Sequence, residues 1–250
     1  MSYVVFVKEK SIKMALTRAI LGLVIGVIVR IRHLDVTELR LFILIPPLKL
    51  WASGADAMPD LTLDSDHVYR LRGQVIPGVT QVIDSNGLIP DFAKKEAYRL
   101  RGEYVHLAMS LYGRGRLNWA ELDPRLLGFV LSGVKFYEEM EFKPSVIESP
   151  EYHPDYAYGF TIDALGQSRQ GLLLPDWKSG KAMLPATRLQ LAAYREGARR
   201  KYGGRFKTVA VELDEDGGSP NLRFLGNERG DWAEFLSCLN VFRLKEKPNA

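Results

Sequence analysis

The chain has 250 residues, 46% of them hydrophobic, which is enough for one sizeable core, and we expect one main folded domain. Its single cysteine, Cys238, excludes a disulfide framework and a Cys-ligated zinc or iron–sulfur site, so any bound metal must use oxygen ligands and histidine. The formal net charge is +4, but beyond residue 57 basic and acidic residues are equal at 26 each. Overall charge therefore does not by itself support a polyanionic partner.

The first 57 residues differ from the rest of the sequence. They hold 8 Lys and Arg against 4 Asp and Glu, and their apolar run from Ala19 to Val29 is shorter than the roughly 20 residues of a membrane-spanning helix. The only Ala-x-Ala pattern, Ala55–Ala57, lies far beyond that run, which disfavours export. Translation from upstream of a natural start at Met58 and a helix that binds a membrane surface or a partner both stay open. We expect an atypical extension over 1–57, without stable membrane insertion, and a folded domain over 58–250.

Two helices are predicted in the first half of that domain. A short extended stretch at Val75–Pro77 precedes a helix over about Asp91–Tyr112, which Gly113 closes. The second helix covers Leu126–Met140, because Asp-Pro at 123–124 supplies an N-cap and a proline at the first helical position.

The second half predicts mostly strands, separated by Pro and Gly. The expected elements are strands over Ser145–Glu148, Tyr158–Leu165 and Leu172–Lys178, a helix over about Thr187–Lys201, strands over Thr208–Leu213 and Asn221–Leu225, and a closing helix from Asp231. This order predicts an α/β fold, with a central mixed β-sheet flanked by helices.

Two aspartates stand at the ends of strands that are joined by a short connection. Asp163 and Asp176 flank the hairpin-like segment Gly166–Gly171. If the turn centres between Arg169 and Gln170, the two carboxylates face each other on the sheet. Like charges in this position are destabilising, and both groups ionise only if a positive charge lies between them. A divalent cation would supply that charge.

A lysine and a third acid belong to the same predicted cluster. Because strand side chains alternate, Lys178 shares the face of Asp176 while Trp177 points the other way. Glu148 closes an earlier strand and presents another carboxylate. Oxygen ligands suit Mg²⁺ or Mn²⁺, which activate water for displacement at phosphorus, and the lysine could position that water. Singly, each acid is more often a turn former or a solvated charge, but together with the lysine they indicate a metal site.

Two pairs of residues spaced four apart place polar groups on the predicted helices. Gln190 and Tyr194 lie on the sheet-facing side, where the glutamine needs hydrogen-bond partners from the backbone or from the lysine region. Gly102 and His106 form the other pair, in which the missing side chain lets another backbone approach. The imidazole is then either structural or a contact to metal or substrate.

Three arginines follow another face of the Thr187–Lys201 helix. Arg195 and Arg199 each fall within about 20° of Arg188 on the helical wheel. We expect this basic stripe to point away from the sheet as a solvated face, with contact to a DNA backbone as the alternative.

The order of these motifs resembles the RecB-like branch of the PD-(D/E)XK nuclease superfamily. The motifs that carry the resemblance are Gly102-x3-His106, Glu148, Gly159-x3-Asp163, Asp176-x-Lys178 and Gln190-x3-Tyr194. The resemblance covers roughly Pro77 to Tyr194, and Ile76–Gln81 is similar to the opening of phage-type exonucleases of this branch. The closing strands and helix are also similar to those proteins, whereas nothing before Met58 is.

The resemblance implies a three-layer restriction-endonuclease-like core and Mg²⁺-dependent hydrolysis, with Mn²⁺ as the alternative ion, to products with 5′-phosphate and 3′-hydroxyl ends. It assigns metal binding to His106, Glu148, Asp163, Asp176 and the Trp177 carbonyl. It makes Lys178 the residue that acts on the nucleophilic water, beside the catalytic carboxylates Glu148, Asp163 and Asp176, and it lets Gln190 and Tyr194 orient the site or substrate. With one cysteine, the chain looks like the type without an iron–sulfur cluster.

Three hypotheses about function follow from the sequence. The leading one is a DNA exonuclease for recombination or repair in the cytoplasm of a bacterium or a phage-infected cell, with DNA and a recombination protein as partners. The second is a catalytically inactive nuclease fold that binds DNA or protein, which is disfavoured because a pure binder gains nothing from opposed acids. A membrane-associated role that rests on Ala19–Val29 is the third.

Overall fold

The computed structural model describes residues 60–91, 95–182, 185–224 and 226–246. The expected extension over residues 1–57 lies outside these ranges. Within them, the helices are all too short or too polar to cross a membrane.

A mixed five-stranded sheet forms the centre of the domain. Its strands are β4 (Lys143–Tyr152), β5 (Gly159–Ser168), β6 (Gly171–Lys178), β7 (Lys207–Glu212) and β8 (Asn221–Phe224), and they lie side by side in sequence order. Only β6 and β7 pair in parallel, because helix α5 connects them as a crossover, and the other neighbours are antiparallel. Each antiparallel connection is a loop without an intervening α-helix.

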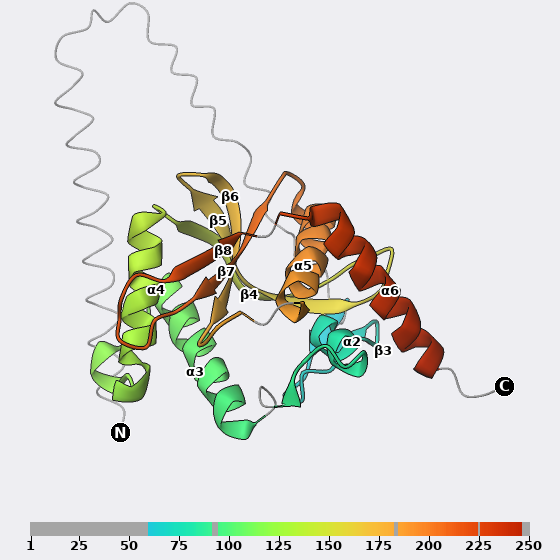
Figure 1. Ribbon diagram of the computed structural model, residues 1–250, viewed down its shortest axis with the longest axis horizontal. Coiled ribbons are helices and arrows are strands. Elements are labelled where there is room, and N and C mark those ends of the chain that lie inside the picture. Colours follow the sequence, from blue (N-terminus) through green and yellow to red (C-terminus); the bar gives the residue numbers. More distant parts are fainter. Residues whose placement is uncertain (1–59, 92–94, 183–184, 225, 247–250) are drawn as a thin grey trace, which may run out of the picture. The chain divides into compact units, whose positions relative to one another are not determined.

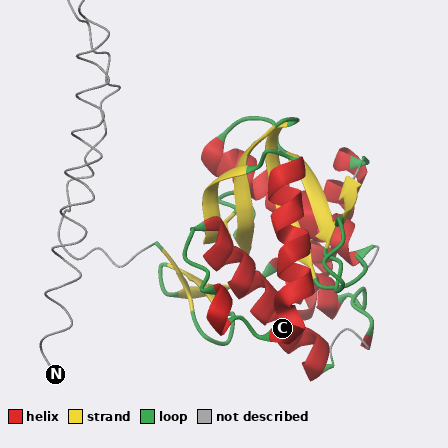
Figure 2. Cartoon of the chain, turned by 90° about the vertical axis from the view of Figure 1, so that its left-hand side faces the viewer, coloured by secondary structure: helices red, strands yellow, loops and turns green. Residues whose placement is uncertain are grey.

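Helices cover both faces of this sheet (Figure 1, Figure 2). The helices are α2 (Val79–Ser85), α3 (Glu96–Gly113), α4 (Leu127–Glu139), α5 (Ala186–Tyr202) and α6 (Glu228–Glu246). Side chains alternate along β6, so Leu174 packs in the cluster formed with α2, α5 and α6, whereas Leu173 and Trp177 pack in the cluster formed with α3 and α4. The predicted α/β class and three-layer core are confirmed.

A small three-stranded sheet precedes α2, and the sequence predicted only its last strand. It contains β1 (Leu61–Leu63), β2 (Tyr69–Leu71) and β3 (Gln74–Ile76). The chain after β3 joins the central sheet at the start of β5, where Gly159 N donates to Pro77 O at 2.8 Å. A Cβ atom on Gly159 would lie 2.2 Å from Tyr69 Cγ, so this position needs a glycine.

Several predicted boundaries are correct, and others needed correction. Among the latter, β5 continues past the predicted Leu165 to Ser168, and α6 begins at Glu228, before the predicted Asp231. Asp123 caps the turn before α4, since its Oδ1 accepts from Arg125 N at 2.9 Å, and α3 ends at the predicted Gly113. However, α3 begins at Glu96 and not at Asp91. Strand β4 also does not end at Glu148 but continues through Pro150 to Tyr152.

The predicted hairpin register is confirmed. Strands β5 and β6 pair Gly166 with Leu173 and Ser168 with Gly171, which leaves a two-residue turn at Arg169-Gln170. The same register, continued, places position 163 opposite position 176.

Candidate active site

The candidate site lies where strands β5 and β6 separate. Their ladder ends at Gly166 and Leu173, and beyond it the Asp163 carboxylate reaches across to the neighbouring strand. Asp163 Oδ2 accepts a hydrogen bond from Trp177 N at 2.9 Å. The Asp163 carboxylate is thus bound to the backbone N–H of the residue after Asp176. The two aspartates are therefore not the directly opposed pair that the register alone predicted.

Three potential ligands from three different elements converge at this point. His106 from α3, Glu148 from β4 and Asp163 from β5 each place one ligand atom within 4.8 Å of the others. The β4–β5 register, which pairs Ile147 with Ala164, brings Glu148 opposite Asp163. Residues that are far apart in the sequence therefore form one cluster of donors.

His106 bridges two groups that the family resemblance assigns to a metal. Its Nδ1 lies 3.3 Å from Asp163 Oδ1, and its Nε2 lies 2.8 Å from the Trp177 carbonyl oxygen. Burial favours the neutral ring, but the charge and hydrogen bond of Asp163, together with the charge of Asp176, outweigh burial and raise the pKa of His106 to about 9. In this arrangement the imidazolium supplies positive charge between Asp163 and the Trp177 carbonyl.

The protein compensates the negative charges of Asp163 and Glu148 to different extents. Burial opposes ionisation of Asp163, yet His106 lowers the pKa of this carboxyl below its usual value. Glu148 is the reverse case, because burial and the charge of Asp163 raise its pKa to about 7. Glu148 Oε1 is buried without a hydrogen-bond partner among the described residues, and the backbone of Glu148 has a φ of 44°, in the left-handed region. Such strain and an unpaired buried oxygen are typical of functional positions.

Asp176 and Lys178 form an ion pair, from which hydrogen bonds continue to α5. Lys178 Nζ lies 2.7 Å from Asp176 Oδ2 and donates to Gln190 Oε1 at 3.0 Å. Gln190 Nε2 in turn donates to the Tyr194 hydroxyl at 3.0 Å. Burial raises the pKa of Asp176, although Lys178 opposes this effect. The lysine is therefore held from two sides, by a carboxylate on its own strand and by an amide on α5.

The remaining predicted positions give a mixed outcome. Asp176 lies outside the group of three ligand atoms, although its charge acts on both His106 and Asp163. Trp177 points away from Lys178 as predicted, and its ring is buried against Phe136, with the centroids 5.3 Å apart.

The predicted close approach at Gly102 is wrong. Among the described residues, a Cβ there would meet only Ser179 Oγ, at 4.0 Å, which is ordinary contact.

The predicted solvated arginine stripe is also wrong for two of its three members. Arg195 is buried, and its guanidinium contacts Glu228 on α6 at 3.2 Å. Arg188 forms an ion pair with the buried Asp231. Helix α6 packs over this side of α5, which a helical wheel for one helix cannot reveal. Only Arg199 keeps an exposed side chain, half of it accessible.

Sequence reasoning missed two residues beside the cluster. The Tyr69 hydroxyl bonds to Thr161 Oγ1 at 2.8 Å, and burial, with the charges of Asp163 and Glu148, raises the pKa of Tyr69 to about 12. Arg114 donates to the carbonyl of Ile147 at 2.7 Å and its charge acts on Glu148. Neither residue stands in a motif, and both reach the site only through the tertiary fold.

The donors that are present fit a hard divalent cation. The cluster offers carboxylate oxygens, a backbone carbonyl and one imidazole, and no described residue satisfies Glu148 Oε1. Several carboxylates at one place are compensated well by a divalent ion, and oxygen-rich ligand sets favour Mg²⁺ or Mn²⁺. The site is therefore compatible with a bound divalent metal.

Comparisons with known proteins found likenesses among solved structures alone. No family model matches the chain, and no curated protein matches it. Among solved structures, one of those that match is a presumed exonuclease from Eubacterium rectale, with 14% identity and a TM-score of 0.37. The match covers 66% of this chain and 71% of that one.

Proposed function

We propose that the protein is a metal-dependent nuclease that hydrolyses phosphodiester bonds of DNA. The observation that carries this proposal is the convergence of His106, Glu148 and Asp163 where β5 and β6 separate, near the Asp176–Lys178 ion pair, with a buried glutamate oxygen left unsatisfied. A fold that needed these acids only for its stability would pair each with its own donors. Here the chain holds a lysine beside a cluster of acids that lacks enough positive charge.

Glu148, Asp163, Asp176 and the Trp177 carbonyl would hold Mg²⁺, or Mn²⁺ as the alternative, and His106 would be a further ligand. When bound, such an ion supplies positive charge to the phosphate and lowers the pKa of water. For His106 to act as a ligand, its ring must lose a proton, because both ring nitrogens now face acceptors.

The other residues position the reacting groups. Asp176 and Gln190 fix the ammonium of Lys178, so it can orient a water molecule or stabilise charge on a phosphate oxygen. The Tyr194 hydroxyl accepts from Gln190, which leaves Gln190 Oε1 directed at the lysine. Gln190 and Tyr194 thus act as positioning residues on α5.

The finer assignment rests on the motif order described above. It favours an exonuclease of the phage type that acts in recombination or repair, with DNA and a recombination protein as partners, in the cytoplasm of a bacterium or a phage-infected cell. A nuclease that requires strand ends degrades linear DNA and spares closed circles.

The experiment that tests the proposal uses the full chain with end-labelled linear DNA and with closed circular DNA, in Mg²⁺ and in EDTA. We expect Mg²⁺-dependent loss of linear DNA that Asp176→Asn and Lys178→Met abolish, while Asp155→Asn, a change at an exposed acid, leaves it intact. DNA binding without metal-dependent cleavage would overturn the enzyme proposal and favour an inactive nuclease fold. Cleavage of closed circles at the same rate would refute the exonuclease assignment alone.

A further inference from the structure

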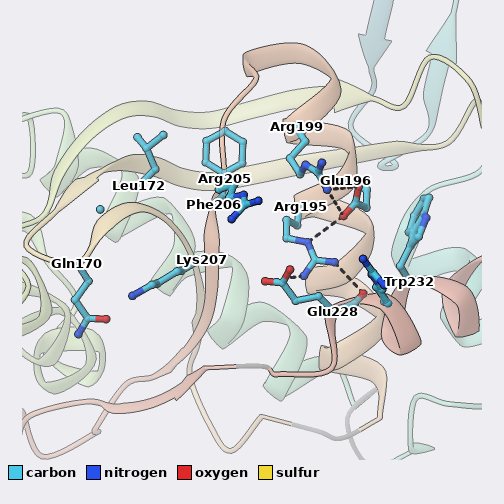
Figure 3. Close-up of a pocket in the computed structure, with 12 residues that line it drawn as sticks. Gln170, Leu172, Arg195, Glu196, Arg199, Arg205, Phe206, Lys207, Glu228 and Trp232 are labelled. Atoms are coloured by element: carbon cyan, nitrogen blue, oxygen red, sulfur yellow. Dashed lines mark hydrogen bonds and ion pairs between the residues drawn. The ribbon is translucent and has the colours of Figure 1, made fainter.

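A second candidate site lies at the other end of strand β6. A pocket of about 650 Å³ opens between the β5–β6 turn, the last turns of α5, the segment before β7 and the start of α6 (Figure 3). Its volume is within the range of sites that hold a ligand of nucleotide size. The pocket and Lys178 lie seven residues apart along β6, which corresponds to about 23 Å of extended strand. It is therefore separate from the acidic cluster.

The pocket is lined by five basic and two acidic side chains. The basic residues are Arg195, Arg199, Arg205, Lys207 and Arg229, and the acids are Glu196 and Glu228. Figure 3 shows the two acids already engaged, because Arg195 lies between them and Arg199 also reaches Glu196. The surplus of positive charge thus comes from the other three residues.

Those three cations lie outside the ion pairs of the described residues. Arg205, Lys207 and Arg229 are exposed, and no carboxylate in the described part of the chain forms an ion pair with any of them. Like charges gathered around one concave surface repel one another unless an anion lies between them. The pocket therefore favours an anionic ligand with several oxygen acceptors.

The chemistry of the lining favours phosphate groups of a nucleic-acid strand. Arginine presents a planar fork of donors that suits phosphate, and two of the three free cations are arginines. Leu172 and Trp232 add apolar surface to the wall, on which sugar or base atoms can pack. Alternating charged and apolar contacts are typical of grooves for single-stranded nucleic acid.

We propose that this pocket is a second DNA contact, which binds phosphate groups of a single-stranded segment some distance from the bond that is cut. The inference rests on the proposed nuclease function, since it takes the ligand to be the same DNA. At about 3.4 Å per nucleotide, a strand must extend roughly five to seven nucleotides beyond the acidic cluster to reach the pocket. Short fragments bound at the cluster do not reach it.

The first test measures binding without cleavage. A fluorescein-labelled (dT)20 oligonucleotide is titrated with the full chain in EDTA over a series of salt concentrations. Arg205→Ala/Arg229→Ala should weaken binding about tenfold and reduce the slope of log K against log salt by about 1.4, because each lost phosphate contact contributes about 0.7. Arg72→Ala/Arg116→Ala, which removes equal charge at exposed positions elsewhere, should change binding less than twofold.

Equal affinities for the pocket variant and the charge-matched control would overturn the inference. So would weaker binding of a polyglutamate peptide by the pocket variant with unchanged binding of (dT)20, because the pocket would then select an acidic peptide. Since the changed residues are exposed, thermal unfolding should be unchanged. Lys207→Ala, tested independently, should weaken binding about threefold.

A second measurement separates this inference from the nuclease proposal. In Mg²⁺, Arg205→Ala/Arg229→Ala should raise KM for a 20-nucleotide substrate about tenfold while kcat and cleavage of a 4-nucleotide substrate stay unchanged. An unchanged KM for the longer substrate would overturn the second contact and leave the nuclease intact. If no variant and no wild-type chain cleaves DNA, the nuclease proposal fails, whereas binding in EDTA still decides the pocket.

Discussion

Two glutamates on strand β4, Glu148 and Glu151, are compensated in opposite ways. Glu151 is 2% exposed, and its carboxylate accepts from Ser149, from Tyr202 at 2.5 Å and from Lys201 at 2.6 Å. Glu148 keeps one buried oxygen without a partner among the described residues. The fold thus supplies donors to the Glu151 carboxylate, whereas at Glu148 it leaves an acceptor that the described residues do not satisfy, which is what the proposed metal site requires.

The largest effect is expected from removing the charge of Glu148. Glu148→Gln should lower kcat/KM for DNA cleavage in Mg²⁺ about 10²- to 10³-fold, because a metal ligand and part of the charge balance are lost. Steady-state cleavage of linear DNA measures this. Glu151→Gln is the matched control and should retain activity per folded molecule within threefold. Loss of activity in both variants to the same extent would remove the distinction between the two acids.

The metal itself should stabilise the fold through the same glutamate. Mg²⁺ at one hundred times its Kd should raise the free energy of unfolding by about 2.7 kcal/mol, because the ion binds only the folded state. Urea unfolding in Mg²⁺ and in EDTA measures the difference. Glu151→Gln should keep this increase and Glu148→Gln should lose it. An equal increase in both variants would place the ion away from Glu148.

Without metal, the substitution at Glu151 should affect stability more than the substitution at Glu148, which is the reverse of their expected effects on activity. Glu151→Gln should lower the free energy of unfolding by about 1–3 kcal/mol, because it weakens the bonds to Lys201 and Tyr202 around a buried carboxylate. Glu148→Gln should leave the stability in EDTA unchanged or higher, since it removes a poorly compensated buried charge. Urea unfolding in EDTA tests both, and a larger loss for Glu148→Gln would show that this residue is structural.

The smallest effect concerns pH in the metal-free protein. The pKa of Glu148 is raised from 4.5 to about 7, so between these values the folded state binds more protons than the unfolded state. The free energy of unfolding should therefore fall as pH rises from 4.5 to 6, a window in which His106, with a pKa near 9, stays charged when folded. Glu148→Gln should make the decrease in the free energy of unfolding between pH 4.5 and 6 smaller, as urea unfolding at several pH values in EDTA measures. An identical pH dependence in wild type and variant would contradict the raised pKa of Glu148.

The sequence predicted the parts of the site that depend on local rules. Asp163, Asp176 and Lys178 belong to one hairpin whose two-residue turn fixes the register, so their proximity followed from counting along the strands. Gln190 and Tyr194 are one helical turn apart and indeed bond to each other. Their roles in catalysis stay predictions.

The features that the sequence did not predict depend on contacts between distant elements. Arg195 is buried because α6 packs over α5, and Tyr69 reaches Thr161 because the small sheet joins β5. The strands β1 to β3 have three residues each, too few to show a period of two. The strand predicted over Ser145–Glu148 ended before Pro150, yet a proline fits within β4 because this strand lies at the edge of the sheet.

The edge position of β4 has one more consequence. An edge strand exposes unpaired backbone groups onto which a strand of another molecule can add, and this is a route to aggregation. Pro144 and Pro150 lack the N–H that such pairing needs, and the left-handed backbone at Glu148 interrupts the regular pleat between them. The backbone kink that bears the unsatisfied glutamate thereby also protects the sheet against intermolecular strand addition.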